Sequence, residues 1–422
     1  MQRFPKIKST HRSSEPASAS LFAQRAFALF WFARIAAMVA YQMLAVGVGW
    51  QVYALTGSAL DLGLVGLAQF IPAFLLVFVA GHVADRFDRR RVAQVCMAVE
   101  ALAAAGLALG SLQGWITERA IFALIFIVGA ARAFQMPAMA ALLPALVPRA
   151  LFPRAIASNS AGTQSAVIVG PALGGFLYVA GPGAVYAISV ALFLLTGLLM
   201  HLIRLQHAQS RADAPGLDSV FDGIRFIRSR PAVLGAISLD LFAVLLGGAT
   251  ALLPVYARDI LATGPWGLGL LRSSSAVGAL AMALYLARHP MKGRAGHLMF
   301  GAVALFGLLT IVFGVSRSFT LSLAALALMG AADMVSVVVR SSLVQLRTPD
   351  AMRGRVSAVN ALFIGTSNQL GEFESGVTAA WFGIVPSVVI GGLGTLLVVA
   401  LWMRWFPELA RVDRLDALST KD

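Results

Sequence analysis

Apolar residues along this chain gather in twelve long runs, which shorter polar segments separate. A helix that crosses a bilayer needs about 20 mainly apolar residues, and each run is about that long. Proline and glycine inside a run do not exclude a membrane helix, because neighbouring helices satisfy the freed backbone groups. The pattern predicts an all-α membrane protein with twelve transmembrane helices, at residues 27–50, 60–82, 92–112, 120–143, 155–179, 183–204, 232–257, 266–287, 296–315, 319–343, 355–382 and 385–405.

The composition agrees with a membrane protein. Of the 422 residues, 59% are apolar and 12% are charged, and the mean hydropathy is +0.82. Soluble domains have about 45–50% apolar and about 25% charged residues. The chain is therefore too apolar for a soluble globular protein.

The basic residues predict the orientation of the helices. If both termini are cytoplasmic, 26 of the 33 Lys and Arg residues fall in inner tails, inner loops and inner ends of spans. Cytoplasmic loops of membrane proteins carry such an excess. We therefore expect both termini in the cytoplasm. The same loops explain the net charge of +14 without a nucleic-acid partner.

One long polar interruption divides the chain. It begins near Leu205, and its second part places apolar residues on one helical face and Arg225 and Arg228 on the other. This pattern is typical of a helix that lies on the inner membrane surface. The predicted organisation is a disordered cytoplasmic tail at 1–26, an N-terminal six-helix bundle at 27–205, a cytoplasmic linker with a surface helix at 206–230, a C-terminal six-helix bundle at 231–405 and a cytoplasmic tail at 406–422.

The two halves contain a repeat. Shifting the chain by 201 residues aligns the fourth span with the tenth and the fifth with the eleventh. The matched pairs include Gly129 with Gly330, Arg132 with Asp333, Pro148 with Pro349, Arg154 with Arg355 and Asn159 with Asn360. Two parallel-repeat bundles resemble the major facilitator superfamily, and that resemblance implies two halves that rock around a site near the midplane.

The loop after the second span resembles the signature loop of this superfamily. It matches the signature at Gly81, Asp85, Arg86, Arg89, Arg90 and Arg91, while Asp88 stands where the signature has a glycine. The resemblance implies a cytoplasmic latch between the halves, with Asp85 facing the N-terminus of the eleventh helix, where free amides favour an anion. The alternative is that the arginines serve only to set the topology.

The fifth span carries a second motif, formed by Gly170, Pro171, Gly174 and Gly175. It resembles the antiporter motif of drug and metabolite exporters in the superfamily. Small residues also allow helices to pack closely, so a packing role is the alternative.

The segment 353–376 resembles the branch that holds siderophore exporters and macrolide efflux proteins, and the similarity runs from about Phe22 to Glu408. This branch implies proton-coupled export of small amphipathic molecules, of siderophore or drug type, across a bacterial inner membrane. We expect a monomer whose partners are a small-molecule substrate, protons and the lipid bilayer, without a cofactor.

Charged residues within the spans are the candidate coupling or substrate residues, because a charge at the bilayer centre costs about 2.5–3.5 kcal/mol on insertion scales. By the resemblance, the first, fourth, seventh and tenth helices line the cavity. They carry Arg34, Arg132, Asp240, Asp333 and Arg340. Since the repeat equates Arg132 with Asp333, these two residues are expected to form an ion pair or a split substrate site. A purely structural charge pair is the alternative.

For the other acidic residues within the spans, more than one role is possible. Asp240 lies within an apolar stretch, where it is either a proton carrier or the partner of a cation such as Arg34. Glu372 and Glu374 lie about 200° apart around one helix, so only one of them can face the cavity. We favour Glu372, because Asn368 shares its face. Glu100 on the third span is expected to be structural.

Three other functions are alternatives to export. An uptake transporter has the same fold, and a non-transporting membrane sensor would not need the intramembrane acids. An enzyme is not expected, because the six histidines have no metal-ligand spacing and no phosphate-binding Gly-x-x-x-x-Gly-Lys motif occurs. The single cysteine, Cys96, excludes a disulfide within the chain.

Overall fold

The computed structural model describes residues 21–204, 217–289, 291 and 294–412, and over these ranges the chain is helical without a strand. This confirms the predicted all-α class. The long helices are α1 (Arg25–Thr56), α2 (Ala59–Arg86), α3 (Arg89–Gln113), α4 (Glu118–Leu142), α5 (Phe152–Tyr178), α6 (Pro182–Leu202), α8 (Pro231–Leu246), α10 (Gly264–Arg288), α11 (Ala295–Val315), α12 (Phe319–Arg347), α13 (Asp350–Phe382) and α14 (Ile384–Trp405). The short ones are η1 (Leu21–Ala23), η2 (Leu143–Ala145), η3 (Arg149–Leu151), α7 (Leu217–Ser229), η4 (Ala249–Leu252), α9 (Leu253–Val255), η5 (Tyr256–Ile260) and α15 (Pro407–Ala410).

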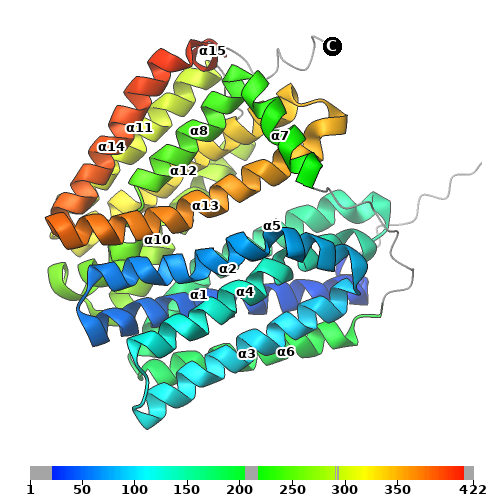
Figure 1. Cartoon of the computed structure of the whole chain (residues 1–422), viewed down its shortest axis with the longest axis vertical. Coiled ribbons are helices and arrows are strands. Elements are labelled where there is room, and N and C mark those ends of the chain that lie inside the picture. Colours follow the sequence, from blue (N-terminus) through cyan, green and yellow to red (C-terminus); the bar gives the residue numbers. More distant parts are fainter. Residues whose placement is uncertain (1–20, 205–216, 290, 292–293, 413–422) are drawn as a thin grey trace, which may run out of the picture.

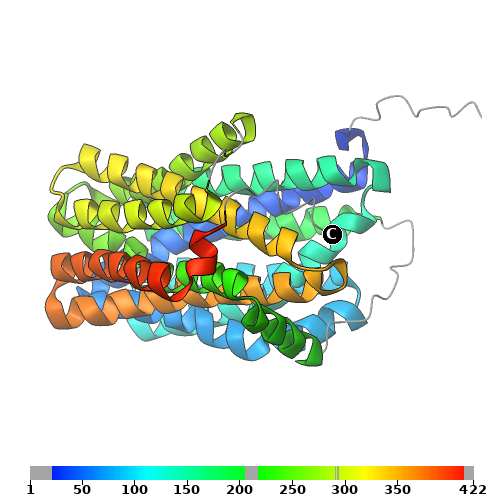
Figure 2. The ribbon, with the colours of Figure 1, turned by 90° about the horizontal axis from the view of Figure 1, so that it is seen from above.

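Within the described part of the chain, ten segments are long and apolar enough to cross a membrane. α5 and α13 are also long enough, but they are more polar and fall outside this set. The count of twelve spans therefore stays a prediction. The long helices run along one common direction (Figure 2).

The seventh predicted span is not one continuous helix, which corrects the prediction for 232–257. α8 ends at Leu246, and the chain continues through η4, α9 and the π-helix η5. The backbone of Gly248 lies against that of Gly371 in α13, where a Cβ would come within 3.0 Å. The Ser375 hydroxyl donates to the freed Gly248 carbonyl at 3.0 Å. Breaks in membrane helices are tolerated when neighbours satisfy the freed groups in this way.

The helices pack in two matching groups, one above the other in Figure 1. In the first, α2 and α3 pack on α4, and α1 packs on α5 and α6. In the second, α10 and α11 pack on α12, and α8 packs on α13 and α14. Because the 201-residue shift relates α4 to α12 and α5 to α13, the packing agrees with the predicted parallel repeat. The bundle limits stay predictions, and the predicted tails lie largely outside the described residues.

The most extensive contacts between the halves are those of α2 with α13 and of α5 with α10. Glycines let the backbones in both helix pairs approach each other closely. A Cβ on Gly175 would come within 2.5 Å of the Pro265 carbonyl oxygen, and a Cβ on Gly376 within 2.7 Å of the Gly63 Cα. The other motif glycines, Gly170 and Gly174, lie against α1. These contacts support a packing role for the antiporter-like motif and leave its link to export a prediction.

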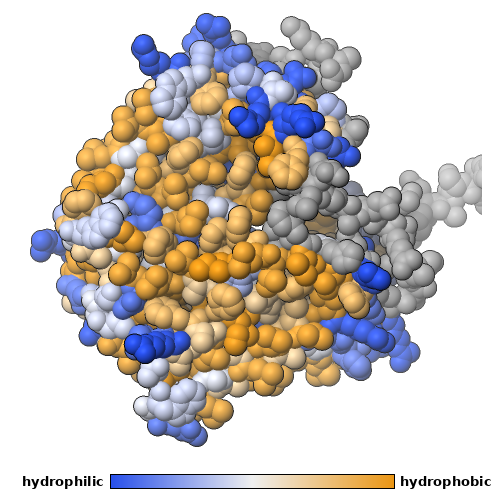
Figure 3. Space-filling model, in the orientation of Figure 1, coloured by the Kyte–Doolittle hydropathy of each residue, from blue (hydrophilic) through white to orange (hydrophobic). Residues whose placement is uncertain are grey.

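The outer surface is apolar around its middle. In Figure 3 hydrophobic side chains cover the centre of the face, and hydrophilic ones gather towards its edges. Leu102, Leu75 and Leu397 are 72%, 65% and 60% exposed. A broad exposed apolar face of this kind suits contact with lipid chains.

The predicted surface helix is present as α7, and most of its apolar face packs on the protein, while Phe221 is 61% exposed. Ile224, Phe226 and Ile227 pack into the core of the second half. A Cβ on Gly223 would come within 3.1 Å of the Arg355 carbonyl oxygen in α13. The Arg355 side chain also pairs with Asp222 at 2.9 Å. α7 is therefore docked on α13, and its position on the inner membrane surface stays a prediction.

Candidate functional site

The second half holds a buried ion pair between α8 and α12. Arg340 Nη1 lies 2.7 Å from Asp240 Oδ2, and the two side chains are 4% and 7% exposed. The cation that pairs with Asp240 is thus Arg340 and not Arg34, because α12 packs against α8 within the same half. A buried pair of this kind is held together by direct contact, since each charge alone would lack solvation.

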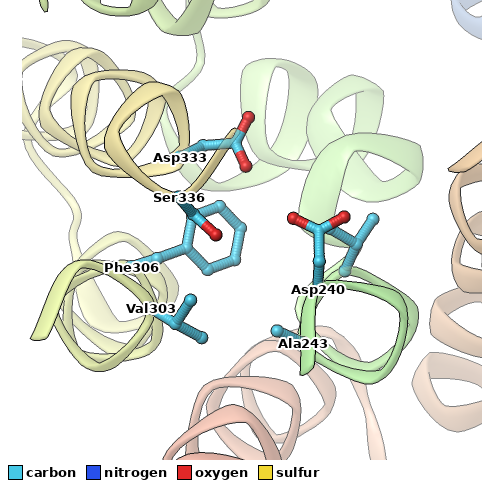
Figure 4. A pocket seen from close by; sticks show the side chains of 7 residues that line it. Asp240, Ala243, Val303, Phe306, Asp333 and Ser336 are labelled. Carbon is cyan, nitrogen blue, oxygen red and sulfur yellow. The ribbon is translucent and has the colours of Figure 1, made fainter. Parts of the chain in front are cut away.

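Asp333 lies beside this pair, close enough for the charges of Asp240 and Arg340 to act on it. Figure 4 shows the carboxyl groups of Asp333 and Asp240 extending toward one space from facing helices. Within the described ranges, Asp333 forms no ion pair of its own. The space is a small pocket lined by Asp240, Ala243, Val244, Val303, Phe306, Asp333 and Ser336.

This arrangement leaves one charge unmatched. Arg340 can neutralise one of the two carboxyl groups, so the other requires a proton or a cationic group from a ligand. An ionisable residue within a membrane is a functional candidate for this reason. Of the predicted residues, the structure brings together Asp240, Asp333 and Arg340.

The first half holds a cluster of mainly positive charge. The Arg132 guanidinium carbon lies 3.5 Å from the centre of the Tyr41 ring. The Tyr41 hydroxyl donates to Gln69 Oε1 at 2.6 Å. Arg34 is near enough for its charge to interact with that of Arg132. A cation over an aromatic face at this distance is an attractive contact.

The predicted pairing of Arg132 with Asp333 is not formed among the residues that the structure describes. Arg132 lies on the Tyr41 ring in the first half, whereas Asp333 lies beside Asp240 in the second. The repeat equates their sequence positions, but each side chain lies next to residues of its own half. The halves therefore carry clusters of opposite character, basic in the first and acidic in the second.

Glu372 lies at the contact between the halves rather than in the Asp240–Asp333 pocket. A Cβ on Gly66 of α2 would come within 2.9 Å of Glu372 Oε2, so the Glu372 side chain lies close against the α2 backbone. The charge of Arg272 on α10 acts on it. Glu372 thus occupies an interface that has to move if the halves rock.

The signature loop is held within the first half by its arginines. The Asp88 side chain accepts from the Arg90 amide at 2.9 Å and caps α3, with φ −60°, so this position needs no glycine. Arg89 donates to the Ala141 carbonyl at 3.2 Å and Arg90 to the Ile203 carbonyl at 2.6 Å. The side chain of Asp85 lies outside the described side chains, so its latch role stays a prediction.

Sequence reasoning missed a contact between the halves near the C-terminal end of α1. The Tyr53 hydroxyl donates to Asp259 Oδ2. The Arg258 guanidinium donates to the Tyr53 carbonyl at 3.1 Å. The sequence marks Arg258 only as a basic residue of an outer loop, and only the π-helical turn of η5 brings it to α1.

No cluster of three or more side chains suited to a metal ion occurs among the described residues. The polar groups of the candidate site are carboxyl, guanidinium, phenol and amide groups, which bind protons or charged and hydrogen-bonding organic molecules.

The chain is similar to known membrane transporters. The chain is 28% identical over 388 residues to a protein named enterobactin exporter EntS from Citrobacter koseri, covering 92% of this chain and 93% of that protein. A mutant of the nucleoside transporter NupG superimposes with a TM-score of 0.71 at 15% identity, covering 90% of this chain and 100% of NupG. A bacterial homologue of the iron transporter ferroportin, in an inward-facing state, gives 0.69 at 16% identity, with 90% and 98% coverage.

These structures share the fold alone, since their sequences are distant. The model of one family, described as transmembrane secretion effector (MFS_3), matches residues 17–421. With its all-helical fold, its repeated halves and this match over nearly its whole length, the chain belongs to the transmembrane secretion effector family of major facilitator transporters.

Proposed function

We propose that the protein is a secondary active exporter that uses protons to move siderophore-like molecules out of the cytoplasm. The observation that carries the proposal is the unmatched carboxyl group of Asp333 beside the buried Asp240–Arg340 pair. The similarity to enterobactin exporters over 92% of the chain supports export of a siderophore-like substrate.

The helix contacts suggest how transport proceeds. The halves meet along α2–α13 and α5–α10, where glycines let the backbones approach closely. Rocking at these contacts exposes a central site to one side of the membrane at a time. Asp333 accepts a proton from the outside and releases it to the cytoplasm, and Arg340 balances whichever carboxyl group is ionised.

The first half supplies groups that suit the substrate. Arg34 and Arg132 bring positive charge, and Tyr41 and Gln69 add an aromatic ring and an amide. Such groups suit an aromatic or anionic organic molecule. The acidic second half then takes the proton while the basic first half takes the substrate.

The remaining assignments follow from the same proposal. The protein is a carrier and not an enzyme, and it works as a monomer in the bacterial inner membrane with both termini in the cytoplasm. The loop from Gly81 to Arg91 latches the halves on the cytoplasmic side when the protein opens outward, with Asp85 as its central residue. Glu372 couples the α2–α13 contact to this movement.

Inside-out membrane vesicles test the proposal, because export from the cell becomes uptake into such vesicles. With radiolabelled enterobactin outside and an acidic interior, we expect accumulation that a protonophore abolishes. Vesicles without the protein serve as the control. Equal accumulation with and without the protonophore would refute proton coupling, and accumulation only in right-side-out vesicles would point to the uptake alternative.

A further inference from the structure

A second acid is buried in the first half, away from Asp240 and Asp333. Glu100 on α3 is 0% exposed. Among the described residues, neither of its carboxyl oxygens has a hydrogen-bond partner. α3 packs against α4 and α6, so this carboxyl group is enclosed between helices. The sequence marked it as structural, yet a structural carboxyl group is normally held by hydrogen bonds.

The groups around Glu100 do not supply those bonds. Arg132 on α4 is close enough for its charge to act on Glu100, and Cys96 lies one helical turn away on α3. Gln135 donates instead to the Met97 sulfur at 3.6 Å. No ion pair joins Glu100 to another described residue.

An ionised carboxylate without hydrogen bonds or an adjacent counter-charge is strongly disfavoured in a dry interior. The cation able to compensate it, Arg132, lies instead over the Tyr41 ring at 3.5 Å. Two arrangements therefore avoid an uncompensated negative charge at Glu100. In one, Glu100 carries a proton and Arg132 lies on Tyr41; in the other, Glu100 is ionised and Arg132 pairs with it.

We propose that Glu100 is a second proton-binding site, located in the first half, and that Arg132 is the cation that takes the place of its proton. On release, the O–H bond of Glu100 breaks, the proton passes to water, and the Arg132 guanidinium moves from the Tyr41 ring to the carboxylate. The present structure corresponds to the protonated arrangement. The role of this step in transport rests on the proposed function, whereas proton binding itself does not.

Infrared spectroscopy of the purified protein without substrate tests proton binding directly. A protonated carboxyl group has a C=O stretching band that an ionised carboxylate lacks. We expect the spectrum at neutral pH to lose one such band in Glu100→Gln and in Glu100→Met. The matched control, Glu118→Gln, removes a partly exposed acid at the start of α4 and should remove carboxylate bands instead.

Loss of carboxylate bands in the Glu100 variants would overturn the proposal, because Glu100 would then be ionised. Arg132→Gln tests the second part. In this variant no cation can take the place of the Glu100 proton, so the C=O band of Glu100 should remain. Disappearance of that band would contradict the assigned role of Arg132. Since no substrate is used, failure here is distinguishable from failure of the transport proposal.

Discussion

Arg340→Met is expected to destabilise the protein by about 3–5 kcal/mol, the usual cost when one partner of a buried ion pair is removed. The variant leaves Asp240 buried, at 7% side-chain exposure, without the guanidinium that lies 2.7 Å from it. Cys96 supplies the measurement. It is the only cysteine and it is buried, so a thiol-reactive dye reports its exposure as the protein unfolds on heating.

The double variant Asp240→Asn with Arg340→Met should recover most of the lost stability, because neither charge then remains. Arg119→Met is the matched control, since this arginine is 91% exposed, and surface changes are usually worth within about 0.5 kcal/mol. A double variant as unstable as the sum of its single variants would show that Asp240 and Arg340 do not stabilise each other.

Asp333→Asn is expected to abolish proton-driven accumulation. A pH difference of one unit is worth about 1.4 kcal/mol per proton, which supports about tenfold accumulation for each coupled proton. Asparagine has nearly the same shape and cannot bind a proton at neutral pH. In inside-out vesicles with such a gradient, the enterobactin accumulation ratio of Asp333→Asn should fall from about ten to about one.

Exchange of labelled for unlabelled enterobactin across the membrane distinguishes loss of coupling from loss of folding. This exchange needs no net proton movement, so Asp333→Asn should retain it. Glu118→Gln, which removes a partly exposed acid, should behave like the wild type in both assays. If Asp333→Asn accumulates substrate as well as the wild type, Asp333 is not the proton carrier.

The helices were predictable because the bilayer fixes the length of apolar runs. The repeat was predictable too, since α4 begins at Glu118 and α12 begins 201 residues later at Phe319. The break after α8 was not, because it depends on the contact of Gly248 with Gly371 and on the Ser375 hydroxyl. A hydropathy pattern contains no information about such contacts between helices.

The identities of the candidate residues were predictable, but their partners were not. The apolar surroundings in the sequence mark Asp240, Asp333 and Arg340 as buried charges. The repeat paired Arg132 with Asp333, yet Arg132 lies on Tyr41. Glu372 was expected in the cavity, and it lies against Gly66 at the contact between the halves. A partner depends on which helices pack together and how each is rotated, and one sequence does not fix that rotation.

Proton movement driven by substrate is the most direct test of proton-coupled export. Purified protein in liposomes with a pH-sensitive dye inside is given enterobactin outside, without an imposed pH gradient. Antiport predicts that the interior becomes more alkaline as enterobactin enters and protons leave, beyond any change in protein-free liposomes. Entry of enterobactin through the protein with no change in internal pH would contradict the account.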